Sequence, residues 1–554
     1  MDPVIVGGAG PVGLALSLAL AAQGVPSVVL DEGAGKDEPR AARSVVLRAD
    51  TAALVERLGC TTIRDEGTRW SGWRSLRRKQ EVRAVRLGGD RLQAPVHIPQ
   101  HALVRGLRDA IAAQDLVQVA THSRLDALEQ DGSGVTVHTR EPEATWWRGS
   151  YLVGCDGARS TVRKLLGIRF PGRTAVERHA VAALRTELPW PGEGVLHRLP
   201  PWRAGCEEVT ARPLPDGAWR LDWLLPARGE LVTPDALVSR VRDTLSGWCD
   251  GAAQYDLIDT GVYTLHHRLA RRWRVDRAFL AGDAAHLLGA VGTQALDEGL
   301  RDVDNLAWKL SHAWHYGASD LLLDSYQAER RTAVAARLRA ADQSLPILRG
   351  SGGLRTYLPG AVRGHDTLLT DGHLGLGPLG APPAYPHSPL APRHAESHAP
   401  VGTPIGAPVS DVQVTAPDGT TVRLRDRLGQ GRLLVVLVAP GTGVWDRRHW
   451  MTAGVMPQLA RAVTELPARA ELLVTEGYPG TSAHTVLLVR PDGHLATAFS
   501  GVRPAELYAA ADAVRGGAPT SVPGQAAGPD VDRGADRPLD HGADHTADRT
   551  ADVN

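Results

Sequence analysis

The apolar residues at the start of the chain predict a strand, a turn, a helix and a second strand. Val4-Ile5-Val6 is an uncharged run of branched residues, which is typical of a buried parallel strand. Leu14 to Gln23 are rich in Leu and Ala and predict a helix that ends at Gly24. Ser27 to Leu30 predict the second strand, which finishes at Asp31. This order indicates the first unit of an α/β fold.

Later apolar runs predict further elements of the same kind. His101 to Ala113 predict a helix, and residues 117–120 and 134–138 predict strands at the edge of a sheet. Tyr151 to Arg163 predict a strand, a tight turn and the start of a helix. Residues 175–270 carry short alternating runs that are rich in Trp, Thr, Val and Pro. We therefore expect them to form an antiparallel sheet beside the first domain.

The turn after the first strand carries three glycines at the spacing of a dinucleotide-binding loop. Gly8 permits the tight turn, Gly10 lets the backbone approach the phosphates, and Gly13 lets the helix pack closely on the strand. The start of the helix would face the pyrophosphate, because free N–H groups and the helix dipole favour an anion there. We therefore predict cofactor contacts for Pro11 and Val12 as well.

The acidic end of the second strand completes this site. Asp31 follows Gly8 by 23 residues and is placed to accept hydrogen bonds from the adenosine ribose, with Glu32 beside it. A signal peptide is the plainer alternative, but it would need Lys or Arg before the apolar region. The chain begins Met1-Asp2 instead. The sequence therefore predicts a dinucleotide site.

A second segment, far along the chain, fits the return strand of the same site. Residues 277–286 read Arg-Ala-Phe-Leu-Ala-Gly-Asp-Ala-Ala-His and place Gly282 and Asp283 directly after an apolar run. Together with the glycine turn, this segment predicts an enzyme that binds FAD. His286 is expected to be a packed residue behind the site and not a proton shuttle.

Composition and charge exclude several other functions. The formal net charge of the 554 residues is zero, so nothing indicates nucleic acid or an acidic membrane surface as a partner. No apolar run is long enough to span a membrane. The four cysteines are scattered without metal-site spacing, so we expect no metal and a reducing cytoplasm: Cys60, Cys155, Cys206 and Cys249.

With these motifs, residues 3–345 resemble the single-component, group A flavoprotein monooxygenases of the p-hydroxybenzoate hydroxylase fold. The similarity is to the branch of aromatic polyketide hydroxylases and phenol hydroxylases. It implies an α/β fold, with a Rossmann-like FAD-binding domain and an interleaved antiparallel-sheet substrate domain. It also implies a C-terminal thioredoxin-like α/β domain. The expected boundaries are 1–174 (FAD-binding, with a substrate-side segment at about 70–100), 175–272 (substrate sheet), 273–350 (FAD-binding), 351–400 (linker), 401–515 (thioredoxin-like) and 516–554 (disordered tail).

The resemblance also implies roles for individual residues. The glycine turn would bind the ADP part of FAD, Asp156-Gly157 would serve flavin and nicotinamide binding, and Gly282-Asp283 would contact the ribityl chain. Arg43 and Gln100 fall where the family keeps an FAD-binding arginine and a flavin-contacting glutamine. Asp156 could instead be only a turn residue, because Asp-Gly favours tight turns. Arg43 could be a solvated side chain.

The stretch after the Gly-Asp motif should contact the reactive part of the flavin. In the family the start of this helix points at the pyrimidine edge, where backbone N–H groups stabilise the charge of reduced flavin. Backbone groups of Leu296 and Asp297 are the candidates for this contact, and Gly292 and Thr293 would line the approach to the reactive face. No side chain there needs to transfer a proton.

Two residues of this stretch depart from the family pattern. Ala290 replaces a proline and Asp297 replaces an asparagine at the helix start. An ionised Asp297 would oppose the charge of reduced flavin unless its side chain turns away to cap the helix. We expect capping. The departures leave Baeyer–Villiger insertion or oxidative rearrangement open beside hydroxylation.

The chemistry that the resemblance implies is oxygenation of an aromatic compound. NADPH or NADH reduces the flavin, dioxygen forms a C4a-hydroperoxyflavin, and one oxygen atom passes to the substrate. The expected substrate is a polycyclic, polyketide-derived phenol of secondary metabolism, and a homodimer is possible. A non-catalytic scaffold with this fold is the alternative from another class; full retention of the FAD motifs argues against it.

Trp and Arg residues are the candidates for substrate contact. Flat apolar rings in the segments expected near the flavin suit a polycyclic phenol, although they suit a sheet core equally: Trp70, Trp73, Trp202, Trp219 and Trp223. Arg212 and Arg220 could hold a phenolate or a carboxylate, but we expect them to be solvated at the surface.

The last third of the chain has a different composition. Residues 351–400 are rich in Gly, Pro and His and predict an extended connection. Buried strands are predicted within 431–439, 471–475 and 485–489, and a hairpin turn at Arg490-Pro-Asp-Gly-His494. The region 401–515 has no cysteine, which excludes redox activity and favours a structural or dimerisation role. The tail has no apolar face to bury.

Overall fold

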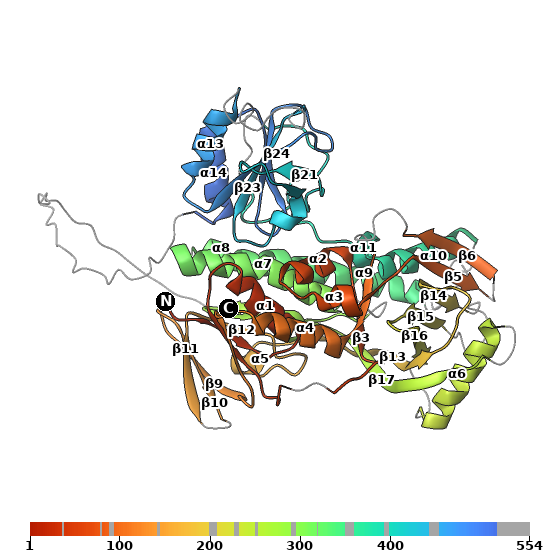
Figure 1. Cartoon of the computed structure of the whole chain (residues 1–554). Helices are drawn as coiled ribbons and strands as arrows, with labels where there is room; N and C mark the ends of the chain where they lie inside the picture. Colours follow the sequence, from red (N-terminus) through yellow and green to blue (C-terminus); the bar gives the residue numbers. More distant parts are fainter. Residues whose placement is uncertain are drawn as a thin grey trace, which may run out of the picture.

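The computed structural model describes most of the chain as three packed regions (Figure 1). The first contains the glycine turn, the second is a large sheet, and the third is a separate C-terminal domain. The described residues are 1–35, 38–77, 80–87, 94–140, 144–198, 208–225, 232–249, 253–289, 295–317, 319–348, 359–392, 398–441 and 454–517. The predicted tail therefore lies almost wholly outside the described residues.

A six-stranded sheet in the order β18-β19-β12-β1-β2-β8 forms the centre of the first region. Val6 of β1 pairs in parallel with Val29 of β2 and with Val153 of β12, so β1 lies between them. All four residues of β1 are buried, as its uncharged sequence predicts. The strands are β1 (Val4–Gly7), β2 (Ser27–Leu30), β8 (Val117–Ala120), β12 (Tyr151–Gly154), β18 (Arg274–Val275) and β19 (Ala278–Leu280).

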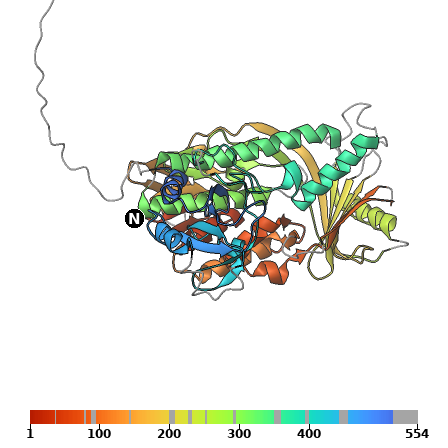
Figure 2. The ribbon, with the colours of Figure 1, turned by 90° about the horizontal axis from the view of Figure 1, so that it is seen from above.

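Helices cover this sheet and join it to the rest of the molecule. The first helix, α1 (Pro11–Ala21), lies against α4 (Gln100–Ala112) and the long α7 (Ala295–Tyr316). It begins three residues earlier than predicted, because Pro11 takes its first position. Seen from above, the green helices extend from this region toward the yellow strands of the second sheet (Figure 2). The other helices here are α2 (Ala49–Arg57), α3 (Thr62–Glu66), α5 (Thr161–Leu165), α8 (Asp320–Tyr326) and α9 (Thr332–Leu348).

Two small sheets flank the first region. Strands β9 (Leu125–Gln130), β10 (Val135–Thr139) and β11 (Thr145–Gly149) form an antiparallel unit of their own. The strand predicted at 134–138 thus exists, but β10 is the central strand of this unit and not an edge strand. The second small sheet is β3 (Ser44–Leu47), β7 (Val96–Pro99) and β4 (Thr68–Arg69).

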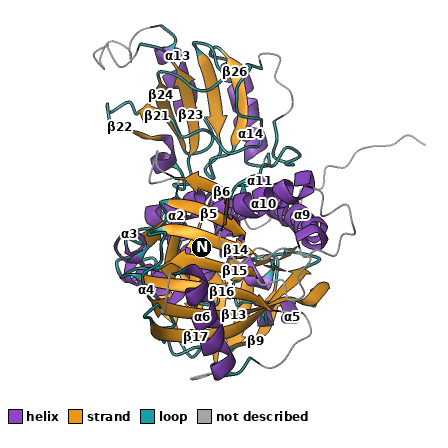
Figure 3. Cartoon of the chain, turned by 90° about the vertical axis from the view of Figure 1, so that its right-hand side faces the viewer, coloured by secondary structure: helices purple, strands orange, loops and turns teal. Residues whose placement is uncertain are grey.

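An eight-stranded sheet forms the second region in the order β20-β17-β13-β16-β15-β14-β5-β6 (Figure 3). Its pairs are antiparallel except for β14 and β5, which run parallel. Because β5 and β6 come from residues 72–86, the sheet is interleaved with the first region, as predicted. The strands are β5 (Gly72–Arg77), β6 (Gln80–Arg86), β13 (Gly172–Arg185), β14 (Glu193–Arg198), β15 (Glu208–Pro213), β16 (Ala218–Leu225), β17 (Asp256–Leu269) and β20 (His286–Leu287).

Helices occupy two places where the sequence analysis expected none. Helix α6 (Pro234–Trp248) packs Leu237, Val241 and Leu245 onto the sheet that was expected to fill residues 175–270. Its start is capped by Thr233, whose hydroxyl accepts a hydrogen bond from the N–H of Ala236. The expected linker at 351–400 contains α10 (Pro359–Leu374) and α11 (Gly377–Gly380). The extended-connection prediction is therefore wrong for these residues.

The C-terminal domain, residues 398–441 and 454–517, is a mixed α/β unit. Its six strands follow the order β22-β21-β24-β23-β25-β26, and all three predicted buried strands are present. The domain lies across α2, α7 and α8 (Figure 1). Its elements are β21 (Gln413–Thr415), β22 (Thr421–Arg423), β23 (Leu433–Val438), α13 (Met456–Thr464), β24 (Ala470–Thr475), β25 (Thr485–Val489), β26 (Leu495–Ser500) and α14 (Pro504–Val514).

Candidate active site

A cavity of about 350 Å³ lies where the first region meets the eight-stranded sheet. Six of the residues predicted to bind FAD reach it from four separate segments. They are Gly10, Pro11 and Val12 of the glycine turn, Arg43, Gln100 and Asp283. Gly157 and Leu296 line it as well. The structure thus brings residues from the beginning, middle and end of the first region around one space.

The glycine turn has the geometry that its sequence predicts. Gly8 has φ +105°, and a Cβ there would lie 2.7 Å from the carbonyl oxygen of Cys155. A Cβ on Gly13 would lie only 2.0 Å from the carbonyl oxygen of Gly8, so α1 can approach the strand only without a side chain here. Gly10 is the N-cap of α1, and a Cβ there would meet no atom within 4 Å.

Asp31 braces the turn from the end of β2. Its Oδ2 accepts a hydrogen bond from the N–H of Ala9 (2.7 Å) and its Oδ1 from the N–H of Gly33 (2.8 Å). A carboxylate can accept about four hydrogen bonds, so both oxygens keep capacity for a ribose. The side chain of Glu32 is 76% exposed and lies 3.9 Å from Arg124. Glu32 does not line the cavity, so its predicted cofactor contact stays a prediction.

Asp156 fits both of the interpretations that the sequence left open. Its Oδ2 accepts hydrogen bonds from the N–H groups of Thr161 (2.6 Å) and Val162 (3.0 Å) at the start of α5, as a structural residue would. Its buried Oδ1 has no partner among the described residues. An unsatisfied buried oxygen is costly, so a donor from a ligand would be favoured there.

The Gly-Asp motif forms a short 3₁₀ turn, η2 (Gly282–Ala284), that presents Asp283 to the cavity. Asp302 of α7 holds this turn from behind, because its Oδ2 accepts hydrogen bonds from the N–H of Gly282 (2.9 Å) and from Nε2 of His286 (2.7 Å). His286 is fully buried and stacks on Trp273. It is a packed residue behind the site, as expected.

Arg43 and Gln100 meet at the cavity. Nε of Arg43 donates to Oε1 of Gln100 across 3.2 Å, and the N–H of Gln100 donates to the carbonyl oxygen of Arg43. These two residues are 57 positions apart in the sequence. The alternative that Arg43 is merely solvated does not account for this pairing.

The first turn of α7 lines the cavity through Ala295 and Leu296. Asp297 turns away from it: Oδ1 accepts hydrogen bonds from the N–H of Arg48 (3.0 Å) and from the hydroxyl of Thr51 (2.5 Å). Asp297 therefore hydrogen-bonds to residues at the start of α2 and does not cap its own helix, which corrects the expected cap. Its charge faces Arg48 and not the cavity. Ala290, Gly292 and Thr293 lie outside the described residues.

These residues fit the FAD that the resemblance implies. The open side of Gly10 leaves room for a phosphate at the start of α1. The carboxylate of Asp283 lines the cavity and accepts no hydrogen bond from any described residue, and burial raises its pKa. Together with the unsatisfied Oδ1 of Asp156, these groups present acceptors for the hydroxyl groups of a cofactor.

We expect an Asp283→Ala variant to bind FAD roughly ten- to a hundredfold more weakly, the effect of losing one hydrogen bond to a charged group. The apoprotein should be at least as thermostable as wild type at pH 7.5. The reason is that a carboxyl whose pKa is raised in the folded state destabilises that state wherever it must ionise. Fluorescence titration with FAD and melting of both apoproteins measure this. Unchanged FAD affinity would contradict the assigned contact.

Two arginines that the sequence analysis placed at the surface form the opposite wall of the cavity. Arg212 and Arg220 are only 2% and 7% exposed. They face each other on β15 and β16, where their backbones are paired. Nε of each has no hydrogen-bond partner among the described residues. The expectation of solvated side chains is wrong, because strand alternation turns both toward the interior.

One carboxylate beneath the wall is shared by three cations. Asp222 lies 3.2 Å from Arg220, 3.7 Å from Arg212 and 2.7 Å from Nδ1 of His179, and it also accepts the hydroxyl of Tyr263. Burial alone would lower the pKa of His179, but Asp222 and Glu177 outweigh it and raise the pKa to about 9. The wall therefore carries more positive charge than Asp222 can neutralise.

His97 is the neutral member of this wall. Burial and the two arginines lower its pKa well below the usual value. Its Nδ1 donates to the carbonyl oxygen of Pro213 (2.8 Å), so its Nε2 accepts from the hydroxyl of Ser44 (2.8 Å). His97 fixes Ser44, and the oxygens of Ser44 in turn accept hydrogen bonds from Arg220.

The raised pKa of His179 predicts a pH dependence of stability. The folded pKa is about 9 against about 6.5 in the unfolded chain, so the contribution is complete below pH 6.5 and lost as the pH rises through 9. We expect the free energy of unfolding of wild type to fall by about 3 kcal/mol across this window through His179. Urea unfolding of the apoprotein at fixed ionic strength measures it. In a His179→Gln variant the free energy of unfolding should lack this part of the pH dependence. An equal pH dependence in both proteins would contradict the role of His179.

The described tryptophans that were candidates for substrate contact lie in cores, which is the alternative that the sequence left open. Trp70 and Trp73 pack with α10 in one core, and Trp219 and Trp223 pack with α6 in another. None of these four lines the cavity, and Trp202 lies outside the described residues. The apolar part of the lining comes instead from aliphatic residues that the sequence analysis missed, such as Val46, Leu265 and Leu288.

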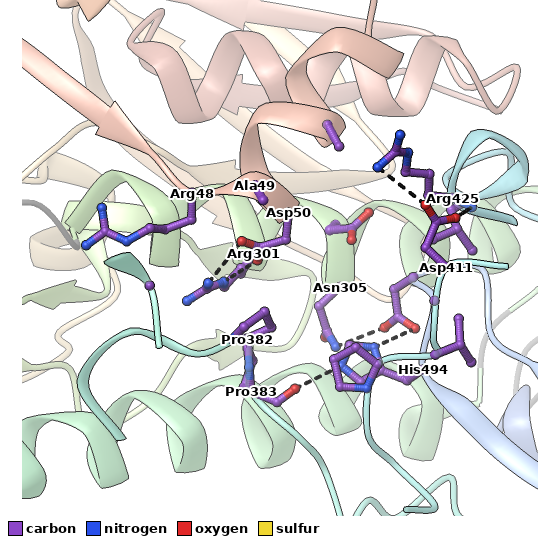
Figure 4. A pocket seen from close by; sticks show the side chains of 18 of the residues that line it. Arg48, Ala49, Asp50, Arg301, Asn305, Pro382, Pro383, Asp411, Arg425 and His494 are labelled. Carbon is purple, nitrogen blue, oxygen red and sulfur yellow. Dashed lines mark hydrogen bonds and ion pairs between the residues drawn. The ribbon is translucent and has the colours of Figure 1, made fainter. Parts of the chain in front are cut away.

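A larger cavity, about 440 Å³, lies between α2, α7 and the C-terminal domain (Figure 4). It contains none of the FAD motifs. Its polar groups pair with one another: Arg301 with Asp50 (2.8 Å) and Arg425 with Asp411 (3.3 Å). We therefore assign the active site to the smaller cavity.

The described residues contain neither a candidate metal site nor a candidate membrane span. No group of three or more His, Cys, Asp or Glu side chains within them could hold a metal ion. Among the helices formed by these residues, none is both long and apolar enough to cross a membrane.

Comparison with known proteins places these features in a family. A family model described as "FAD binding domain" matches residues 1–341. The 3-(3-hydroxy-phenyl)propionate/3-hydroxycinnamic acid hydroxylase of Mycobacterium sp. (strain JLS) is 29% identical over 541 residues, which cover 92% of this chain and 91% of the relative.

Two further proteins extend the comparison. The rifampicin monooxygenase of Streptomyces venezuelae is 33% identical over 352 residues, which cover 60% of this chain and 68% of that protein. The solved structure of the anhydrotetracycline hydroxylase OxyS from Streptomyces rimosus superposes with a TM-score of 0.65 at 26% identity, covering 94% of this chain and all of that chain. The likeness to OxyS thus includes the C-terminal domain.

Proposed function

Because the chain belongs to the FAD binding domain family, we propose that it is an FAD-dependent monooxygenase that adds one oxygen atom from dioxygen to an acidic aromatic substrate. The substrate class we propose is a polycyclic phenol of polyketide origin, in secondary metabolism. The reductant is NADPH or NADH. The monooxygenase and hydroxylase names of the relatives support this reaction class.

One observation carries the proposal: a single cavity joins the FAD motifs to a buried pair of arginines. Asp283 and the glycine turn line it from the first region, and Arg212 and Arg220 line it from β15 and β16 of the eight-stranded sheet. Bound FAD supplies the uptake of reducing equivalents and the activation of dioxygen. A phenolate or carboxylate on the opposite wall would hold the ring between the two.

The residues of the chain bind and orient the reactants. Arg212 and Arg220 offer charged donors to an anionic oxygen, which strengthens each hydrogen bond. Val46, Leu265 and Leu288 provide apolar contacts to a ring and exclude water. The backbone at the first turn of α7 adds the positive end of a helix dipole on the side of Leu296.

The position of Asp297 favours hydroxylation over the alternatives. Its replacement of asparagine is one of the two departures, with Ala290, that keep oxygen insertion and rearrangement open. Because its carboxylate faces Arg48 and Thr51, it does not place a negative charge against the cofactor. Hydroxylation is therefore the reaction we propose.

The cellular setting is part of the proposal. We place the protein in the cytoplasm as an enzyme without nucleic-acid or membrane partners. Three described cysteines, Cys60, Cys155 and Cys249, are free thiols, which supports a reducing compartment. A homodimer formed through the C-terminal domain, which the resemblance likens to thioredoxin, remains a prediction for gel filtration to test.

Purified protein should show a flavin spectrum, and phenols should accelerate its oxidation of NADPH. With ¹⁸O₂ the product should gain one labelled oxygen as a hydroxyl group. An ester or lactone product would establish insertion instead. A protein that stays colourless after incubation with FAD would overturn the proposal, as would bound flavin with no stimulation by any acidic aromatic compound.

A further inference from the structure

A short π-helical turn, η3 (Gln327–Arg331), connects most of the functional parts of the molecule. Isolated π turns within helices are rare and often occur at functional sites. Gln327 accepts a hydrogen bond from the N–H of Trp273, just before β18, and Arg331 donates to the carbonyl oxygen of Ala270. Two neighbouring residues of the turn, Glu329 and Arg330, carry charges at 3% and 0% exposure.

Glu329 is held by the C-terminal domain. Arg490 of the predicted hairpin turn approaches it with both ends of its guanidinium, at 2.6 and 2.9 Å. Asp492 orients the same guanidinium at 2.6 and 3.0 Å. Lys309 and Asn305 of α7 donate to Glu329 at 2.8 and 2.7 Å, and the hydroxyl of Ser388 donates to it at 2.5 Å.

This contact crosses the boundary between the C-terminal domain and α7. Asp492 accepts hydrogen bonds from Asn305 (3.3 Å) and from Nε1 of Trp308 (3.2 Å), both on α7. Asn305 of α7 and His494 of the C-terminal domain both contact Asp492, and both line the larger cavity (Figure 4). Arg490 also lies over the ring of Trp308. The Arg490-Pro-Asp-Gly motif therefore forms a polar contact between this domain and the flavin-binding region.

Arg330, the next residue of the turn, points to the FAD site. Its Nε donates to Oδ1 of Asp302 (2.9 Å), and its Nη2 donates to Oε2 of Glu298 (2.7 Å) in the first turns of α7. The other oxygen of Asp302 holds the N–H of Gly282 at 2.9 Å. That turn presents Asp283 to the cavity. Tyr326 supports it too, because its hydroxyl donates to the carbonyl oxygen of Leu280.

We propose that Arg490 is a positioning residue for the flavin site: through Glu329, Arg330 and Asp302 it fixes the Gly282–Ala284 turn that contacts FAD. The C-terminal domain thereby tunes cofactor affinity and reduction potential without touching the cofactor. This inference rests on FAD binding, which family membership establishes, and not on the proposed substrate.

The physical basis is the cost of unpaired charge in a closed interior. Without Arg490, Lys309 would be left beside two buried carboxylates, those of Glu329 and Asp492, so the interior would hold an excess negative charge and the segment would rearrange to reduce it. Glu329 would lose its bidentate partner, and the adjacent Arg330 moves with the same turn of backbone. A displacement of the Gly282–Ala284 turn then alters the contacts of Asp283 with the ribityl chain.

Arg490→Met and Glu329→Gln are the variants that test this. Each should bind FAD roughly tenfold more weakly and shift the reduction potential and visible spectrum of the bound flavin. Arg490→Lys should restore part of each change, because it keeps the charge. The matched control is Leu487→Ala, which truncates a fully buried residue of the same domain away from Glu329. It should lower the melting temperature and leave the flavin properties unchanged.

A double-mutant cycle provides the second measurement. Arg490→Met combined with Asp302→Asn should change FAD affinity by less than the product of the single effects, because both act on the same turn. Multiplicative effects would overturn the inference. It would also be overturned if the Arg490 and Glu329 variants melt at lower temperature like Leu487→Ala but keep wild-type FAD affinity and potential. Should Arg490→Met fail to fold, Glu329→Gln and Arg490→Lys give the same readouts.

Discussion

A Gly10→Ala variant should fold as wild type does and bind FAD about a hundredfold more weakly. Gly10 has φ −74° and ψ 176°, a conformation that alanine adopts without strain. The added methyl group would meet no protein atom within 4 Å, so the apoprotein should keep its melting temperature. The same methyl group would occupy the space where the pyrophosphate approaches the start of α1. Losing one or two charge-assisted hydrogen bonds there corresponds to about 3 kcal/mol.

Two other glycines give the matched comparison. Gly247→Ala, in α6, also adds a methyl group with no atom within 4 Å, and it should leave FAD affinity unchanged. Gly13→Ala should damage both the fold and FAD binding, because its Cβ would lie 2.0 Å from the carbonyl oxygen of Gly8. FAD titration and melting of the apoproteins distinguish the three variants. Wild-type affinity in Gly10→Ala would show that the phosphates lie elsewhere.

The first region could be predicted from the sequence because its determinants are local. The strand, turn and helix around Gly8 and Gly13 need only neighbouring residues to define them, and β2 and β8 have the predicted boundaries. The role predicted for Asp283 came from the family resemblance, and only the apolar run before its turn is a local signal. In such segments the spacing of apolar residues and the turn residues indicate the same structure.

Helices α6 and α10 were missed for different reasons. A helix signal is present before and within α6: Thr233-Pro234 at its start and apolar residues at Leu237, Val241 and Leu245. It was overlooked because residues 175–270 were interpreted as sheet throughout. In α10 the Gly and His content suggested a loop, but the buried Leu369 and Leu374 pack on Trp73 and Trp70 of another region. Tertiary contact decides such a segment, and its own sequence does not reveal the partner.

The substrate side of the cavity could not be predicted because it depends on strand pairing. Arg212 and Arg220 are close only because β15 and β16 pair in one particular register. A shift of one residue would turn both outward. Asp297 shows the same limit: its partners, Arg48 and Thr51, lie about 250 positions earlier in the chain.

Replacing Arg212 should change substrate binding and leave the cofactor in place. Arg212→Met removes a buried cation of the cavity wall, while Asp222 keeps Arg220 and His179 as partners. We expect the KM for an acidic phenol to rise ten- to a hundredfold with kcat nearly retained, the pattern for lost binding shared by ground and transition states. FAD affinity should stay within about twofold of wild type, because no predicted FAD contact involves Arg212.

The charge of the substrate provides the decisive control. The methyl ester or methyl ether of the same compound lacks the anionic oxygen, so its weaker binding to wild type should be nearly unaffected by Arg212→Met. Arg185 is an exposed arginine of β13 that pairs with Asp256. The Arg185→Met variant should therefore leave the KM for both compounds unchanged. An equal loss for the acid and its neutral derivative would mean that Arg212 supports the wall by packing alone. A KM increase for the acid alone would establish that the two arginines select an anionic aromatic compound. The reason is that only a charged oxygen accepts strongly from the donors that the protein leaves unpaired.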